Sequence, residues 1–552
     1  RAMALLALYR NIKKWPDKGR EVESYYRRWT KSEIDKFDLS RVQLPVLICT
    51  FPVLDGRDSA LPNVAEACRA VFLALNKNAK PVSDSRNHLL DDRDLIAEFL
   101  RCTLSLVKDK DALNPSGLRL WNIELDAAED RVSLSSPVAI SGVMHLYYLI
   151  ERLMLGSRGS GISVKKENFG KKTRLDDVVH RLGLNEQFSS DFLDVARRET
   201  LEAQNKKKLS DRFTSLYGQI IVRGLDTFGP YRAHNVAAFG IEVKLRHDPK
   251  GSTYHALLFE GQGRERVFRS YIEEMRDHLK EAYLTPPPEL QQILEEFQAR
   301  EKGLAELSRE FYRKRTDEYL RQAPGWAKQS ETIHDAVWKV LFPQNFTTSA
   351  MQSALFLTFF GVIEAVNDRR GLPPEAAPAL SLEEVSSLFD EYMDEINRFF
   401  LPASPRSLER LVRVFIGNYS SRKDSSSGER LVAIAHSNKC LRKILVPGEL
   451  KPDEWVKFRL IFLELWRSEC PEVSKIVSEE RAVGRSQAVR AFYKREYNEF
   501  VKEHGLQQEE VSDEQAAKLR SECAQTVSSA LRELEATVNQ GELLSALESK
   551  GT

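Results

Sequence analysis

Asp91, Asp92 and Asp94 stand close together where a helix is predicted to begin, and their carboxylates could hold a cation. Mg²⁺ prefers carboxylate oxygens and keeps several of its waters. Asp92 and Asp94 are therefore the predicted metal ligands, and Asp91 joins them as a catalytic candidate. Acidic residues in the first turn of a helix also cap its free N–H groups and complement its dipole without any metal. Capping and metal binding both remain open for these acids.

A polar turn from Asn76 to Lys80 comes before these acids. The Asn76 amide could orient a nucleotide or a water molecule, and the Lys80 ammonium could neutralise a phosphate. The alternatives are a helix C-cap for Asn76, which tolerates the left-handed conformation, and a solvated loop lysine for Lys80. His88 is the titratable base nearest to the turn, although a histidine in such a place is more often a packing or surface residue.

Basic side chains gather in two further stretches that could contact a DNA backbone. The first follows a Gly/Ser segment, Gly156–Gly161, which lacks the spacing of a Walker A loop. The DNA contacts predicted in these stretches are Lys165, Lys166, Lys171, Lys172 and Arg174 in the first, and Arg485, Arg490 and Lys494 in the second. An exposed loop and a solvated helix face are the alternatives.

The elements that position these groups follow from the apolar pattern. Leu44–Phe51 is a continuous apolar run that predicts a buried strand, and a helix is predicted from about Asp91 to Val107. A short strand is predicted at Trp121–Leu125. Helices and strands in this order indicate an α/β domain. The predicted fold class is mixed α/β and predominantly helical.

Most of the chain beyond this domain is predicted to be helical. A small β-hairpin is predicted near 241–259, where two apolar runs flank Asp248–Ser252. The helices predicted from apolar spacing are Gly142–Leu155, Glu289–Gln322, Met351–Asn367, Leu382–Phe400 and most of the last part of the chain. The predicted domains are 1–137, 138–330, 331–420 and 421–552.

The composition excludes several classes of protein. Lys and Arg number 82 against 81 Asp and Glu, so there is no global basic field and any DNA contact must come from local patches. Six scattered cysteines without C-x-x-C spacing argue for reduced thiols in the cytoplasm rather than a disulfide framework or a zinc site. The apolar stretch Ala354–Val366 falls short of the roughly 20 residues of a membrane span. A buried helix is predicted there, and no membrane partner is expected.

Two stretches resemble the DGQHR-domain family, which is ParB/sulfiredoxin-like. Leu75–Ser83 together with Leu89–Asp94 is similar to the family's second signature, an N-x-x-A-K-P turn followed by a helix opened by acids. Arg1–Leu8 resembles the helix that follows Asp-Gly-Gln-His-Arg, with Arg1 at the motif's last position. The likeness covers about residues 1 to 150. It leads us to expect that the first four motif residues lie upstream of the sequence given.

This resemblance implies a ParB-like α/β domain with a long helical extension. The family includes DndB-like proteins of DNA-modification and phage-defence systems. The implied function is that of a DNA-associated, nucleotide-binding protein that hydrolyses ATP or GTP. Arg1 and Lys80 would balance phosphate charge, the acids at 91, 92 and 94 would hold Mg²⁺, and water would be the nucleophile. The implied partners are DNA, subunits of the same system and a second copy of the chain. A non-enzymatic DNA-binding regulator or scaffold, and a metal-dependent nuclease, are the alternatives.

Overall fold

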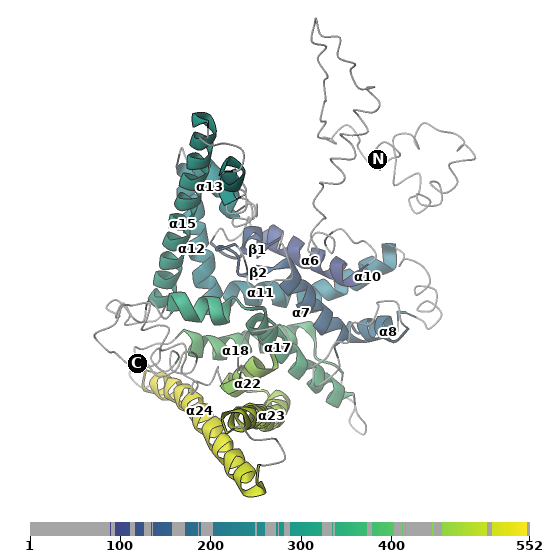
Figure 1. Cartoon of the computed structure of the whole chain (residues 1–552). Helices are drawn as coiled ribbons and strands as arrows, with labels where there is room; N and C mark the ends of the chain where they lie inside the picture. The colour runs from purple at the N-terminus through teal and green to yellow at the C-terminus, as the bar shows by residue number, and fades with distance from the viewer. Residues whose placement is uncertain are drawn as a thin grey trace, which may run out of the picture. The chain divides into compact units, whose positions relative to one another are not determined.

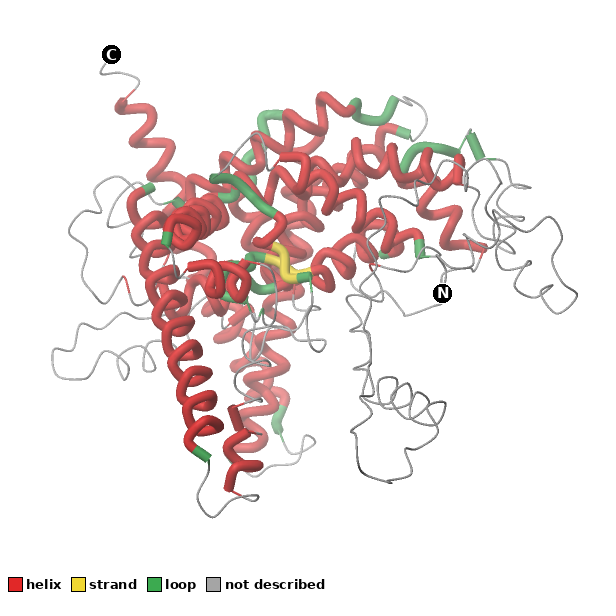
Figure 2. Tube along the Cα trace, turned by 90° about the horizontal axis from the view of Figure 1, so that it is seen from above, coloured by secondary structure: helices red, strands yellow, loops and turns green. Residues whose placement is uncertain are grey.

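A long apolar helix, α17 (Ser349–Arg370), lies inside the fold of the computed structural model (Figure 1). Besides single residues, the structure describes residues 94–110, 116–125, 136–156, 172–185, 187–188, 203–248, 251–259, 272–273, 275–280, 287–322, 337–371, 378–401, 455–504 and 511–548. All of them belong to one structural unit, Pro81–Thr552. This unit is predominantly helical, as predicted, and it also contains a small two-stranded parallel sheet (Figure 2).

Helix α17 is buried around nearly its whole circumference because apolar residues occupy every side of it. Its N-cap is Thr348, whose hydroxyl accepts from the backbone N–H of Met351 at 3.3 Å. By length and composition α17 could cross a membrane, but 83% of its most apolar window is covered by the rest of the protein. The predicted buried helix is therefore confirmed. Its neighbours are α7 (Val143–Leu155), α18 (Leu382–Phe400), α22 (Trp455–Leu465) and α23 (Pro471–Glu503).

The predictions for α7 and α18 are also confirmed. In α18 the Ser381 hydroxyl accepts from the N–H of Glu384 at 3.2 Å, while the Glu384 carboxylate accepts from the N–H of Ser381 at 2.7 Å. This reciprocal capping box fixes the first turn. The Tyr392 hydroxyl then donates to the carbonyl of Leu355 at 2.9 Å, which holds α18 against α17.

The first helices of the unit surround the sheet. Strand β1 (Ile123–Glu124) pairs in parallel with β2 (Ser141–Gly142), with Ile123 opposite Ser141. The strand predicted at 121–125 is thus present in shortened form, after the 3₁₀ turn η3 (Leu120–Asn122). Strand β2 contacts α7, and η3 contacts α6 (Leu95–Lys110). The elements packed against α6 or α7 are α8 (Lys172–Arg181), α10 (Ala203–Phe213), the π-helical turn η4 (Thr214–Gly218) and α11 (Gln219–Thr227).

The β-hairpin predicted near 241–259 is wrong. The segment forms the end of α12 (Gly229–His247) and the whole of α13 (Gly251–Phe259). The run Ile241–Arg246 alternates apolar and polar residues, but the burial follows a helix, since Ile241 and Leu245 lie inside and Val243 is only half-buried. Ile241 and Leu245 sit one turn apart and pack with Leu304 and Phe311 of α15 (Pro288–Arg321) in a second apolar cluster.

The C-terminal part that the structure describes is mostly helical, which agrees with the prediction. It consists of α22, α23 and α24 (Asp513–Glu548). The main hydrophobic core includes residues from Leu95 through to Leu534, so side chains from all four predicted domains contribute to it. The predicted strand at 44–51 lies outside the described residues, as do the ParB-like features of residues 1–80.

Candidate functional sites

Asp94 lies at the N-terminus of α6, where its carboxylate joins two helices. One oxygen, Oδ1, accepts from the backbone N–H of Ile96 at 2.9 Å, and Oδ2 accepts from the Tyr147 hydroxyl of α7 at 2.6 Å. Burial and then this hydrogen bond raise the pKa of Tyr147 above its ordinary value. These contacts support the capping interpretation of Asp94, and its role as a Mg²⁺ ligand stays a prediction.

The Tyr147→Phe variant is expected to lose about 1–2 kcal/mol of unfolding free energy, because the Asp94 carboxylate loses a half-buried donor. Chemical denaturation of the variant and the parent protein measures this loss. Lys207→Gln is the control, because Lys207 lies on an exposed helix face. Equal stability of Tyr147→Phe and the parent would show that the hydrogen bond from Tyr147 to Asp94 does not contribute to the unfolding free energy.

The other predicted nucleotide and metal residues, Arg1, Asn76, Lys80, Asp91 and Asp92, lie outside the described residues. In the part of the chain that is described, no three His, Cys, Asp or Glu side chains come together as a cation site. The predicted DNA contacts Lys165, Lys166 and Lys171 also fall outside it. Lys172 and Arg174 belong to α8, but their side chains are not described.

Arg485, a predicted DNA contact, makes a two-pronged ion pair between α23 and α22, and its role toward DNA stays a prediction. Its Nε and Nη2 donate to the two carboxylate oxygens of Glu464 at 2.6 and 2.7 Å. The Glu464 side chain is 1% exposed, whereas that of Arg485 is 44% exposed. Nearby, Arg481 donates to the carbonyl of Leu463 at 2.6 Å. The sequence signal for Arg485 was its basic neighbourhood, and a partner on another helix could not be read from it.

Arg490 and Lys494 occupy the exposed side of α23, one turn apart. No ion pair to either side chain is found among the described residues. Both therefore stay available for an anionic partner, and their role as DNA contacts stays a prediction.

A buried polar pair that the sequence did not reveal joins α12 and α15. His234 Nε2 lies 2.9 Å from the carbonyl oxygen of Val138, and because a carbonyl only accepts, Nε2 carries the proton. Burial, followed by the positive charge of Arg315, lowers the pKa of His234 to about 3. Burial also lowers the pKa of Arg315 to about 9. His234 is therefore neutral at physiological pH.

Aromatic rings surround the Arg315 guanidinium. Its central carbon lies 3.9 Å from the ring centre of Phe342 and 4.9 Å from that of Tyr312. Phe342 belongs to η5 (Val337–Phe346), a π-helical segment with Pro343 inside it. Arg315 Nε has no hydrogen-bond partner within the described ranges. Cation–π attraction is thus the stabilising interaction that the structure shows for this charge.

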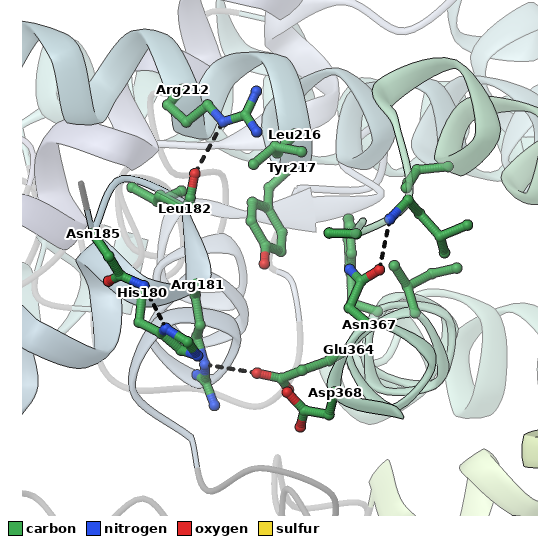
Figure 3. A pocket seen from close by; sticks show the side chains of 16 residues that line it. His180, Arg181, Leu182, Asn185, Arg212, Leu216, Tyr217, Glu364, Asn367 and Asp368 are labelled. Atoms are coloured by element: carbon green, nitrogen blue, oxygen red, sulfur yellow. Dashed lines mark hydrogen bonds and ion pairs between the residues drawn. The ribbon is translucent and has the colours of Figure 1, made fainter. Parts of the chain in front are cut away.

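A cavity of about 310 Å³ opens between α8, η4, α17 and the start of α18 (Figure 3). Its polar lining residues are His180, Arg181, Asn185, Arg212, Glu364, Asn367 and Asp368, and its apolar ones include Leu216, Tyr217, Phe360 and Ile363. Its volume is at the lower end of the range of roughly 300–1,000 Å³ that is typical of small-molecule sites. The converging polar groups come from segments far apart in the sequence, so no local motif could predict this site.

Arg181 builds the floor of the cavity. Its guanidinium donates to the carbonyl of Leu153 at 2.6 Å, to the carbonyl of Gly156 and to the Glu364 carboxylate at 3.1 Å. Directly after α8, Gly183 takes a φ of 67°, a left-handed conformation that favours glycine and turns the chain along the cavity wall.

Comparison of the chain with protein-family models, curated proteins and solved structures finds no significant match. The resemblance of residues 75–94 to the DGQHR-domain family therefore stays a prediction from the sequence.

Proposed function

We propose that the chain is a DNA-associated nucleotide-binding protein that hydrolyses a nucleoside triphosphate in a bacterial DNA-modification or phage-defence system. The observation that carries the proposal is the string from Asn76 to Asp94, which joins a polar, basic turn to an acidic helix start. Asp94 supports it from the structural side, because it ties the end of this string to α6 and α7. The positive end of the α6 dipole lies at Asp94 and favours negative groups there.

The proposal gives different roles to the three acids Asp91, Asp92 and Asp94. Both Asp94 oxygens accept hydrogen bonds inside the protein, so Asp94 is the least suited of the acids to hold an ion directly. Mg²⁺ would fall to Asp92, with Asp91 beside it, while Lys80 and Arg1 would balance the phosphates. Asp94 would act as a positioning residue that fixes the direction of the helix start.

ATP and GTP turnover, measured with and without DNA, tests the proposal. Asp92→Ala and Lys80→Ala are expected to lower turnover about 100-fold or more, because each removes a charge that the transition state needs. Lys207→Gln, on an exposed helix face, is the control. Turnover that is absent in the parent protein, or unchanged in both variants, would contradict the proposal. Metal-dependent cleavage of a plasmid would favour a nuclease instead.

A non-enzymatic DNA-binding regulator or scaffold is the second candidate, and the exposed Arg490 and Lys494 on α23 favour it. Contacts to phosphates are lost as salt rises, because bound cations are released from DNA. A salt-sensitive shift of DNA that weakens in Arg490→Gln/Lys494→Gln, without any nucleotide turnover, would support this candidate over the hydrolase.

A further inference from the structure

Two arginines line the cavity of Figure 3, and they differ in how their nitrogens are used. Each nitrogen of the Arg181 guanidinium donates within the protein, either to a backbone carbonyl or to the Glu364 carboxylate. The Arg212 Nε donates to the carbonyl of Leu182 at 2.9 Å, which holds this guanidinium at the cavity wall. Within the described residues, the two terminal nitrogens of Arg212 make no hydrogen bond or ion pair. They can therefore donate to a ligand.

The position of Arg212 indicates what kind of ligand it could bind. Arg212 lies on one side of Tyr217, and the α17 acids Glu364 and Asp368 lie on the other side (Figure 3). The terminal nitrogens of a guanidinium form a fork that matches the two oxygens of a carboxylate. Because Arg181 is already committed to its partners, Arg212 offers one positive charge to an anion. This suits a single carboxylate better than a triphosphate, which would need several positive charges.

Apolar and aromatic side chains form another part of the lining. The ring centres of Tyr217 and Phe360 lie 4.6 Å apart, and Leu216, Ile363 and Val385 extend the same surface. An apolar ring or chain of a ligand would be removed from water here, and it would contact faces suited to aromatic stacking. The ligand should therefore combine its carboxylate with an apolar body.

The turn η4 joins the two parts of this lining. It is a π-helical turn between α10 and α11, and its residues Leu216 and Tyr217 both line the cavity. Single π-helical turns within helices are uncommon and often occur at functional sites. The Ser215 hydroxyl donates to the carbonyl of Arg212 at 3.0 Å, which ties the turn to the end of α10. One continuous segment thus holds both the arginine and part of the apolar surface.

We propose that this cavity binds a small monocarboxylate with an apolar or aromatic body. Its carboxylate oxygens would accept from the terminal nitrogens of Arg212, and its body would pack against Leu216, Tyr217 and Phe360. The volume of about 310 Å³ suits a ligand built on one aromatic ring. None of the described lining residues belongs to the string from Asn76 to Asp94, so this inference goes beyond the proposed hydrolase.

Three probes test the two halves of the ligand: phenylacetate, phenylacetamide, which lacks the charge, and acetate, which lacks the ring. Ligand-observed NMR titration of the full chain is expected to show phenylacetate binding at roughly millimolar concentration. Phenylacetamide and acetate are each expected to bind at least about tenfold more weakly. Absent binding of phenylacetate, or equal binding of phenylacetate and either other probe, would overturn the proposal.

Two substitutions of Arg212 isolate its charge, because both remove the Nε hydrogen bond to Leu182. Arg212→Gln is expected to weaken phenylacetate binding about tenfold, and Arg212→Lys only about threefold, since an ammonium keeps the charge but lacks the fork. Neither should change the binding of phenylacetamide. Lys207→Gln, on the exposed face of α10, is the matched control, and circular dichroism confirms that each variant is folded. Equal losses in folded Arg212→Gln and Arg212→Lys would overturn the assignment of the carboxylate to Arg212.

Discussion

Acidification from pH 6.5 to about pH 4.5 is expected to destabilise the parent protein by about 2 kcal/mol more than its His234→Gln variant. The unfolded chain binds a proton on His234 near the ordinary pKa of 6.5, while the folded chain resists it down to about 3. The unfolded state therefore binds more protons throughout this window. The His234 contribution is fully favourable to folding above pH 6.5 and is lost as the pH falls toward 3.

Burial, and then the groups around His234, explain why the folded protein resists protonation of this ring. Arg315 approaches from α15 and repels a second positive charge, and the Phe311 ring lies 5.0 Å away at a steep angle. The Val138 carbonyl accepts from Nε2 and by itself favours the protonated ring, but burial and the Arg315 charge outweigh it. Gln keeps a donor for that carbonyl and cannot be protonated in this range, so it isolates the titration.

Urea unfolding of both proteins at the two pH values measures the difference. The other titratable groups contribute equally in the parent and the variant. Only the difference between their losses of unfolding free energy therefore reports on His234. Parallel loss of stability in both proteins would show that His234 is not the group that titrates.

Arg485→Met is expected to destabilise the fold by about 3 kcal/mol, because it leaves the Glu464 carboxylate buried without its partner. Glu464→Gln is expected to cost only about 1 kcal/mol, since the half-exposed Arg485 can turn to water. A larger loss of stability in Arg485→Met than in Glu464→Gln distinguishes a structural ion pair from a surface contact.

Arg490→Met, on the same helix, is the matched control and is expected to change stability by less than about 0.5 kcal/mol. Chemical denaturation of the three variants gives the comparison. Similar small effects for Arg485→Met and Arg490→Met would mean that Glu464 is hydrated and that Arg485 is free to bind DNA as the sequence predicted.

The sequence predicted most helices where a single local pattern decides the structure. The apolar spacing of α18 and the apolar run of α17 are such signals, and both helices formed where predicted. The segment at 241–259 failed because alternation over six residues fits a strand while Ile241 and Leu245 equally fit one face of a helix. Contacts with α15, distant in the chain, select the helix.

The sites were less predictable, since their partners are distant in the chain. The ion pair of Arg485 with Glu464 on another helix could not be read from the sequence, and Arg212 and Asp368 line one cavity although they are far apart in the chain. Asp94 shows the intermediate case. Capping by Asp94 could be read locally, but its link to Tyr147 could not.

The position of α17 has a consequence for how the protein is made. During synthesis α17 leaves the ribosome well before α22 and Trp466, which pack against it in the folded protein. Until residues 455–492 have been synthesised, the apolar surface of α17 stays exposed to solvent. Such exposure favours aggregation or chaperone binding of the unfinished chain. Fragments that end between α18 and α22 should for the same reason be insoluble.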